Sequence, residues 1–216
     1  MNLVLFGPPG SGKGTQAERL RDDLKLRHLS TGDLLRDAVA RETELGKKVK
    51  DVLASGQLVS DDIVLALMRG AIVAVGGDDS LRGWLLDGFP RTIGQAEGLD
   101  ALLAELGQEI DAVVVLDVDR GAVVDRLSGR RTCTQCKTVW HVKNNPPAVE
   151  GVCDRCGGTL VQRNDDRPET ISARLDVYEK QTRPILAHYR GNVPVHEVDG
   201  AMPVDEVTRA IERVLS

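Results

Sequence analysis

Short apolar runs alternate along this chain with longer segments in which apolar residues recur every three or four positions. The apolar runs occupy residues 2–6, 84–86, 112–118 and 193–198, with a weaker one at 27–29. Nearly continuous apolar runs of this length are typical of strands that are buried on both faces of a parallel sheet.

The segments between these runs follow the spacing of amphipathic helices. They lie at residues 13–24, 32–40, 61–75, 92–106, 120–127, 168–189 and 203–215. Strands that alternate with helices predict an α/β fold, here a three-layer sandwich around a parallel sheet of about five strands. Two stretches interrupt the alternation: residues 30–60 are helical without a strand, and residues 131–166 are rich in Gly, Pro, Cys and polar residues. We interpret both as insertions.

The first apolar run is followed by the glycine-rich stretch GPPGSGKGTQ, residues 7–16. A strand, a glycine-rich loop with a lysine, and then a helix form the context of a phosphate-binding P-loop. We expect Gly10, Gly12 and Gly14 to adopt positive φ, so that backbone N–H groups close on phosphate oxygens. A P-loop usually has Ser or Thr directly after its lysine as a magnesium ligand, but here Thr15 comes one position later.

The segment LSTGDLLR, at residues 29–36, follows the weaker apolar run. Taken alone it is a helix start, in which Ser30 caps the helix, Asp33 completes a capping box and Arg36 is a solvated charge. This segment by itself therefore does not indicate a binding site.

The segment LDGFPRT, at residues 86–92, places Asp87 at the carboxyl end of a buried strand, the edge where open α/β sheets bind ligands. An acid at that position usually handles a metal ion or its waters, although it can also be a turn residue before a helix. Gln95 follows Arg91 by four positions, so both side chains can face one ligand if Thr92 opens a helix.

In this order, the three segments resemble those of the adenylate kinase family. The likeness continues through DRLSGRR, HVKNNPP and VQRNDDRPETISARL to VDG near the end, so it covers essentially the whole chain. It implies a P-loop nucleoside monophosphate kinase that transfers a phosphoryl group reversibly from ATP to AMP with magnesium, giving two ADP and supporting adenine nucleotide homeostasis. It also implies a core of residues 1–29, 61–126 and 165–216, a mobile AMP-binding insertion at 30–60 and a mobile lid at 127–164.

The resemblance also assigns site residues position by position. For ATP they are Gly10, Ser11, Gly12, Lys13, Gly14, Thr15, Arg126, Arg130, Val139, Trp140 and Met202. For AMP they are Thr31, Arg36, Gln57, Leu58, Val59, Gly88, Phe89, Pro90, Arg91, Gln95, Arg163 and Arg174. For catalysis they are Lys13, Arg91, Arg130, Arg163, Arg174 and Asp87, while Asp165 and Asp166 match acids of the lid. Magnesium is implied to be held by the nucleotide phosphates and by waters that the strand-end acid orients, so a glycine after the lysine is normal.

The charges of the reactants favour the same residue types without the resemblance. The phosphate of a nucleoside monophosphate has a second pKa near ~6 and is mostly a dianion at neutral pH, so no side chain needs to remove a proton. The reaction needs in-line placement of the reactants and neutralisation of charge on the transferring group. Magnesium, lysine and the planar fork of arginine suit that task.

The four cysteines form two Cys-x-x-Cys pairs, Cys133 with Cys136 and Cys153 with Cys156. This pattern is typical of a tetrahedral zinc site, and four thiolates leave no position for a substrate, so we predict a structural ion. Disulfides are the alternative, but a cytosolic chain would be kept reduced. His141 lies nearby and is not needed as a ligand.

The chain has 28 Lys+Arg, 33 Asp+Glu and a formal net charge of −5, so no overall basic field favours a nucleic-acid partner. No apolar stretch approaches the roughly 20 residues that span a bilayer, and the start lacks the features of a secretory signal. We therefore expect a cytoplasmic monomer whose partners are ATP, AMP and ADP, without a membrane or nucleic-acid partner.

Two other functions remain open from the sequence. A kinase for another monophosphate, such as UMP or CMP, would share the fold and the chemistry, although the long lid and LSTGDLLR resemble the adenylate type. The second is a P-loop ATPase whose zinc ribbon binds nucleic acid. The acidic balance and the aromatic content of 3% argue against it.

Overall fold

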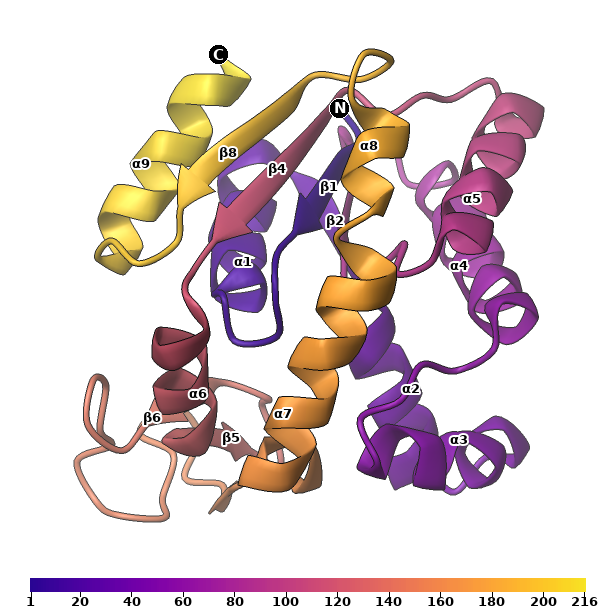
Figure 1. The fold of residues 1–216 in the computed structure, drawn as a ribbon. Coiled ribbons are helices and arrows are strands. Elements are labelled where there is room, and N and C mark those ends of the chain that lie inside the picture. Colours follow the sequence, from indigo (N-terminus) through magenta and orange to yellow (C-terminus); the bar gives the residue numbers. More distant parts are fainter.

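The computed structural model describes residues 1–216, and its centre is a five-stranded parallel sheet (Figure 1). The strands are β1 (Leu3–Phe6), β2 (Leu26–Ser30), β3 (Gly83–Asp87), β4 (Ala112–Asp117) and β8 (Val195–Asp199). Their order is β2-β3-β1-β4-β8, and each neighbouring pair is parallel. The predicted strands are confirmed, with ends that differ by one or two residues.

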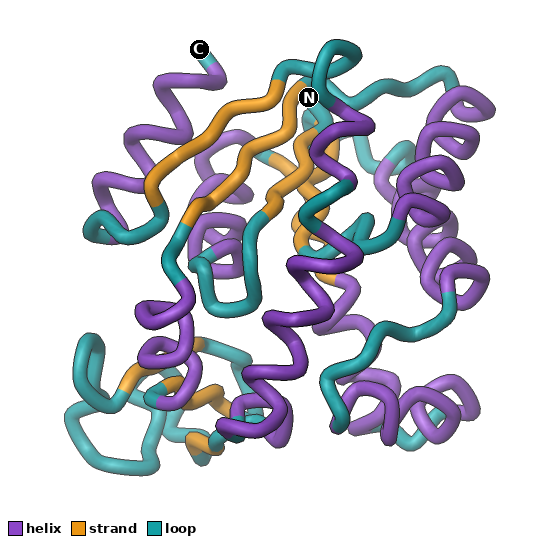
Figure 2. Tube along the Cα trace, viewed as in Figure 1, coloured by secondary structure: helices purple, strands orange, loops and turns teal.

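Most helices lie where the amphipathic spacing predicted them (Figure 2). The exceptions are the helix Glu44–Ala54, which lies in the stretch 30–60 that was described only as helical, and the helix predicted at 168–189, described below. The helices are α1 (Lys13–Leu24), α2 (Thr31–Ala40), α3 (Glu44–Ala54), α4 (Asp61–Val75), α5 (Ile93–Leu106), α6 (Arg120–Ser128), α7 (Pro168–Val177), α8 (Ile185–Tyr189) and α9 (Val204–Leu215). None of these helices combines the length and the apolar character needed to cross a membrane.

Alternate residues of the central strand enter two separate hydrophobic clusters. Val4 and Phe6 belong to the cluster that includes residues of α4, α5 and α8, whereas Leu3 and Leu5 belong to the cluster that includes residues of α1 and α9. Helices therefore cover both faces of the sheet, as expected when all strands are parallel. The predicted three-layer α/β sandwich is confirmed.

The helix predicted at residues 168–189 is not continuous, and the prediction is wrong in that respect. α7 passes into a π-helical segment, Tyr178–Thr182, and α8 begins only after Pro184. Proline has no N–H to donate and its ring clashes with the preceding turn, so an α-helix is broken there. The hydroxyl of Thr182 donates to the backbone oxygen of Arg91 at 2.9 Å, which ties this segment to the chain that follows β3.

The two stretches that interrupt the alternation lie at one end of the molecule, below the sheet in Figure 1. The first contains α2 and α3. The second forms an antiparallel sheet of order β6-β5-β7, built from β5 (Arg130–Cys133), β6 (Val139–His141) and β7 (Leu160–Val161). These strands have only two to four residues, and β5 has the polar sequence RRTC, so no apolar run predicts them.

Candidate active site

The carboxyl ends of the parallel strands open into two adjoining cavities. The smaller cavity includes residues of α2 and the segment before α4, and the larger one includes the glycine-rich loop, Asp87 and residues of the small antiparallel sheet. Arg36, Arg91 and Arg174 line both cavities. Every residue that the sequence assigned to ATP, AMP or catalysis lines at least one of the two cavities, whereas the four cysteines of the predicted metal site line neither.

The glycine-rich loop wraps around the amino group of its lysine. Gly10 and Gly12 have φ of 82° and 103°, which confirms the expected positive values. Lys13 Nζ donates to the backbone oxygens of Gly7 and Pro8, each at 2.8 Å. Burial lowers the pKa of Lys13 to about 8, because desolvation disfavours the charged ammonium.

Gly14 serves a different purpose from the one predicted. It lies inside α1 and has no positive φ, so that prediction is wrong. A Cβ built on Gly14 would lie 3.6 Å from Oδ2 of Asp87. The Ser or Thr side chain that follows the lysine in most P-loops would therefore stand beside this carboxylate, and here an acid from β3 faces that position instead.

Asp87 is the last residue of β3 and lies near His28 and Lys13. Nε2 of His28, on the neighbouring strand β2, lies 3.4 Å from Oδ2 of Asp87. Burial alone would raise the pKa of Asp87, but His28 and Lys13 outweigh burial and hold the pKa below its ordinary value. Asp87 is therefore a carboxylate at neutral pH.

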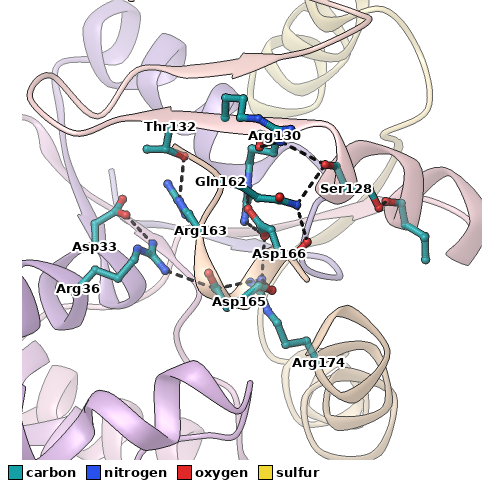
Figure 3. Close-up of polar contacts among 12 residues, drawn as sticks. Asp33, Arg36, Ser128, Arg130, Thr132, Gln162, Arg163, Asp165, Asp166 and Arg174 are labelled. Atoms are coloured by element: carbon teal, nitrogen blue, oxygen red, sulfur yellow. Dashed lines mark hydrogen bonds and ion pairs between the residues drawn. The ribbon is translucent and has the colours of Figure 1, made fainter. Parts of the chain in front are cut away.

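Two carboxylates lie at the centre of an arginine cluster (Figure 3). Asp166, which is fully buried, accepts hydrogen bonds from Arg130 at 2.8 and 2.5 Å and from Arg174 at 3.3 Å. Asp165 forms ion pairs with Arg174 at 3.0 Å and with Arg36 at 4.0 Å. Guanidinium groups from α2, β5 and α7 thus converge on two acids.

Arg91 and Arg163 are buried near other arginines. Burial, reinforced by neighbouring Arg174, lowers the pKa of Arg91 to about 10. Burial, reinforced by neighbouring Arg36, lowers the pKa of Arg163 to about 10 as well. Arg163 Nε also donates to Thr132 Oγ1 at 2.9 Å, which fixes it to β5. Because an added negative charge relieves repulsion between cations, the cluster is suited to bind anions.

The turn after β3 is held from both of its sides. Thr31 Oγ1 and Arg91 Nε both donate to the backbone oxygen of Gly88, at 2.7 and 2.6 Å. Thr92 does not open α5 but caps it, because its hydroxyl oxygen accepts from the backbone N–H of Gln95 at 3.1 Å. The turn therefore fixes the backbone where the two cavities meet.

Comparison with known proteins agrees with this geometry. A family model described as adenylate kinase matches residues 5–193. The chain belongs to the adenylate kinase family. It is 49% identical over 215 residues to an adenylate kinase of Carboxydothermus hydrogenoformans, covering 100% of this chain and 99% of that one. It is 50% identical over 208 residues to an adenylate kinase of Acidothermus cellulolyticus, covering 96% and 94% of the two chains.

Membership of the adenylate kinase family confirms the resemblance seen in the sequence and the prediction that this chain is an enzyme. A third relative, an adenylate kinase of Moorella thermoacetica, is 46% identical over 215 residues, covering 100% of this chain and 98% of that one. The five-stranded parallel sheet and the phosphate loop are those expected of a P-loop nucleoside monophosphate kinase.

This family member also gathers its four cysteine sulfurs into one cluster. The Sγ atoms all lie within 4.8 Å of one another, and all four cysteines are free of disulfides. Cys133 and Cys156 are 3.4 Å apart, and Cys136 and Cys153 are 3.6 Å apart. Bonds of about 2.3 Å to a tetrahedral zinc ion place sulfurs about 3.8 Å apart, so this donor set fits such an ion. The hydroxyl of Thr138 lowers the pKa of Cys136 to about 6, which favours the thiolate form that a metal requires.

The sequence did not identify two polar residues that the adenylate kinase fold brings to the site. His28 lies within a strand, and only the pairing of β2 with β3 places it beside Asp87. Asp61 resembles any acid in the first turn of a helix, yet it accepts hydrogen bonds from Thr92 Oγ1 and Gln95 Nε2, each at 2.8 Å. The sequence indicated only that Gln95 and Arg91 can face one ligand, and it gave no sign of this distant partner.

The ion pairs of Asp165 predict a pH-dependent stability. Arg174 and Arg36 outweigh burial and hold the pKa of Asp165 below its ordinary value, so its contribution is present at neutral pH and is lost as the pH falls through the lowered pKa. The Asp165→Asn variant should unfold more easily at pH 7, by roughly 1–3 kcal/mol. In thermal melts, its difference from the unaltered chain should narrow below about pH 4.

A matched control for that variant is Asp23→Asn, on the exposed face of α1, where no ion pair forms. The melting temperature of Asp23→Asn should stay close to that of the unaltered chain at every pH from 7 to 3. A melting difference for Asp165→Asn that stayed constant from pH 7 to pH 3 would contradict the ion-pair account.

Proposed function

We propose that the two cavities bind ATP and AMP, and that the arginines lining both cavities stabilise the phosphoryl group while it passes directly from ATP to AMP. As in its family, the chain catalyses the reversible, magnesium-dependent reaction of ATP with AMP that gives two ADP and supports adenine nucleotide homeostasis. The observation that carries the assignment of the site is that Arg36, Arg91 and Arg174 line both cavities. Groups at such a junction can contact a donor and an acceptor at once.

The larger cavity is assigned to ATP. Its phosphates would lie along the glycine-rich loop, where the backbone N–H groups at the start of α1 and the ammonium of Lys13 meet an anion. Residues assigned to ATP are Gly10, Ser11, Gly12, Lys13, Gly14, Thr15, Arg126, Arg130, Val139, Trp140 and Met202, all of which line this cavity. Arg126 Nη1 donates to Ser11 O at 3.4 Å, which already holds it against the loop.

The smaller cavity is assigned to AMP. Its apolar walls, from Leu35, Leu53, Val59 and Val64, suit a base, while arginines stand only at the side that meets the larger cavity. This arrangement orients the phosphate of AMP towards ATP. The residues assigned to AMP are Thr31, Arg36, Gln57, Leu58, Val59, Gly88, Phe89, Pro90, Arg91, Gln95, Arg163 and Arg174.

The chemical step is assigned to electrostatic stabilisation without a general base. The AMP phosphate is mostly a dianion at neutral pH, so it attacks without losing a proton. Charge on the transferring group is neutralised by Lys13 and by guanidinium groups that grip phosphate oxygens in pairs. The cationic catalytic residues are Lys13, Arg91, Arg130, Arg163 and Arg174.

Asp87 is assigned to the magnesium ion that accompanies ATP. It is ionised, and it lines the larger cavity together with the glycine-rich loop. Oxygen ligands and water are what magnesium prefers. Asp87 would help to hold a bound magnesium ion, which would neutralise part of the phosphate charge.

We further propose three parts that move relative to one another. Residues 1–29, 61–126 and 165–216 form the core, residues 30–60 bind AMP, and residues 127–164 form a lid. Closure of the lid excludes water, so that ATP is not hydrolysed, and it completes the cage of arginines only when both nucleotides are present. Arg163, tied to β5 in the lid, would arrive with that movement.

The cysteine cluster is assigned to structural zinc. A closed set of four thiolates leaves no coordination position for a substrate oxygen, so the ion supports the lid and takes no part in the reaction. Thiols kept free of disulfides fit a reducing compartment such as the cytoplasm. We propose that the enzyme works there as a monomer, because the two cavities and the arginines between them all come from one chain.

The assignment of the cationic residues predicts large losses of rate. Replacing Lys13 or Arg91 by Met should lower kcat by about 100-fold or more, because each removes a preorganised charge that stabilises the transition state. Steady-state kinetics with ATP and AMP measure the effect, and circular dichroism checks that the fold persists. Arg69→Met is the matched control, since Arg69 pairs only with Glu105 on the outer helices. A Lys13→Met enzyme within a few-fold of the unaltered one would show that the loop is not the phosphate cradle.

The structural role of zinc predicts a separation of stability from chemistry. A Cys153→Ser, Cys156→Ser variant should lose its zinc and melt at a lower temperature, because the polar segment between the Cys pairs cannot build a core of its own. It should keep an appreciable share of its activity well below that melting temperature. Metal analysis, thermal melts and kinetics measure the three quantities. A zinc-free protein that stays folded with its chemical step abolished would instead indicate a catalytic metal.

A further inference from the structure

Asp61 links the start of α4 to the start of α5 and contacts Gln95, which lines the smaller cavity. It lies in the first turn of α4, and its two carboxylate oxygens accept hydrogen bonds from the capping residue and from the first turn of α5. Oδ1 accepts from Gln95 Nε2 and Oδ2 accepts from Thr92 Oγ1, each at 2.8 Å. A Cβ on Gly94 would lie 2.8 Å from Oδ2, so only glycine lets the carboxylate approach this closely.

These contacts leave the side-chain amide of Gln95 with a single orientation. Its Nε2 faces Asp61, and its Oε1 accepts from the backbone N–H of Arg91 at 2.8 Å. A carboxylate only accepts hydrogen bonds and a backbone N–H only donates them. Rotating the amide by half a turn would place oxygen against oxygen and N–H against N–H, so neither contact could survive.

The fixed amide still has hydrogen-bonding capacity for a ligand. Gln95 is 1% exposed and lines the smaller cavity. One N–H of Nε2 and one lone pair of Oε1 are not used by the protein. The amide therefore offers one donor and one acceptor side by side in a fixed order.

That order distinguishes purine bases. Adenine presents an amino donor next to a ring-nitrogen acceptor, which pairs with an amide oxygen and an amide N–H. A 6-oxopurine presents an oxygen acceptor where adenine has the amino group, so it would need the amide in the opposite orientation. An amide that cannot rotate rejects the 6-oxopurine.

We propose that Asp61 is a specificity-determining residue, which fixes the Gln95 amide and thereby makes the smaller cavity select a 6-aminopurine monophosphate over a 6-oxopurine monophosphate. The inference rests on the proposed function, in which this cavity binds the base of AMP. Asp61 is a positioning residue, because it acts through Gln95 and does not itself line the cavity.

The test compares AMP with inosine monophosphate, which differs from AMP at the 6-position of the base. In Asp61→Asn, the new side chain can either accept from or donate to Gln95, so one of the two restraints on the amide is lost. The ratio of kcat/KM for AMP to that for inosine monophosphate should fall by at least about 5-fold, the lower end of the discrimination given by one bidentate contact. KM for ATP should not change, because the ATP cavity is not touched.

Asp62→Asn is the matched control. Asp62 is the second acid in the first turn of α4, so its replacement removes the same charge from the same helix start without touching Gln95. It should leave the ratio unchanged. An equal fall in both variants would show that helix electrostatics, and not the amide, controls selectivity, and would overturn the proposal.

A double variant tests whether Asp61 acts through Gln95. Gln95→Met removes the amide at similar volume, and adding Asp61→Asn to it should cause no further change in the ratio. A further fall of the same size would overturn the proposal. Binding of AMP and of inosine monophosphate without ATP, measured by calorimetry on each variant, gives the same comparison if turnover is too slow to follow.

The outcome for the unaltered chain separates this inference from the proposed function. If the unaltered chain does not phosphorylate AMP, the proposed function fails and the inference with it. If it prefers AMP strongly and Asp61→Asn keeps the full preference while remaining folded, the inference alone is wrong.

Discussion

The crowding of positive charge at the carboxyl end of the sheet is the constraint on which the site depends. Burial, and secondly repulsion from neighbouring arginines, lowers the pKa of Arg91 and of Arg163, so gathering these cations in a poorly solvated space is costly. Asp165 and Asp166 offset part of it, but they face Arg36, Arg130 and Arg174 at the same time. In the proposed function, phosphate groups supply the remaining negative charge, so that substrate binding also relieves this repulsion. A water molecule is neutral and cannot supply this negative charge.

The fold meets this constraint by bringing charges together from segments far apart in the sequence. Parallel strands place the P-loop and Asp87 at one edge of the sheet. Arg174 comes from α7, and Asp165 and Asp166 come from the short segment before that helix. The π-helical segment after α7 is tied to Arg91 O by Thr182. A second layer of contacts then holds the ligand-facing groups: Asp61 fixes an amide, just as the acids fix the arginines.

The sequence predicted the features that depend on local patterns and motifs. These are the five strands, most helices, the phosphate loop and the cysteine cluster. It misjudged Gly14, which lies inside α1 with helical backbone and no positive φ, beside a carboxylate from another strand that the motif does not reveal. The sequence predicted one continuous helix through Pro184, because the apolar spacing continues on both sides of the break. His28 and Asp61 were missed because their partners lie on other elements, and only the tertiary fold brings those partners within reach.

The most direct measurement of the central claim compares acceptors for the phosphoryl group of ATP. Initial rates are measured on the unaltered chain with magnesium and ATP, with AMP, UMP, CMP or water alone as acceptor. The account predicts transfer to AMP on the order of 100-fold or more faster than hydrolysis, because a second phosphate is needed to complete the charge balance and place the reactants in line. Rates with water equal to those with AMP would contradict it, and a preference for UMP or CMP would contradict the assignment of the smaller cavity.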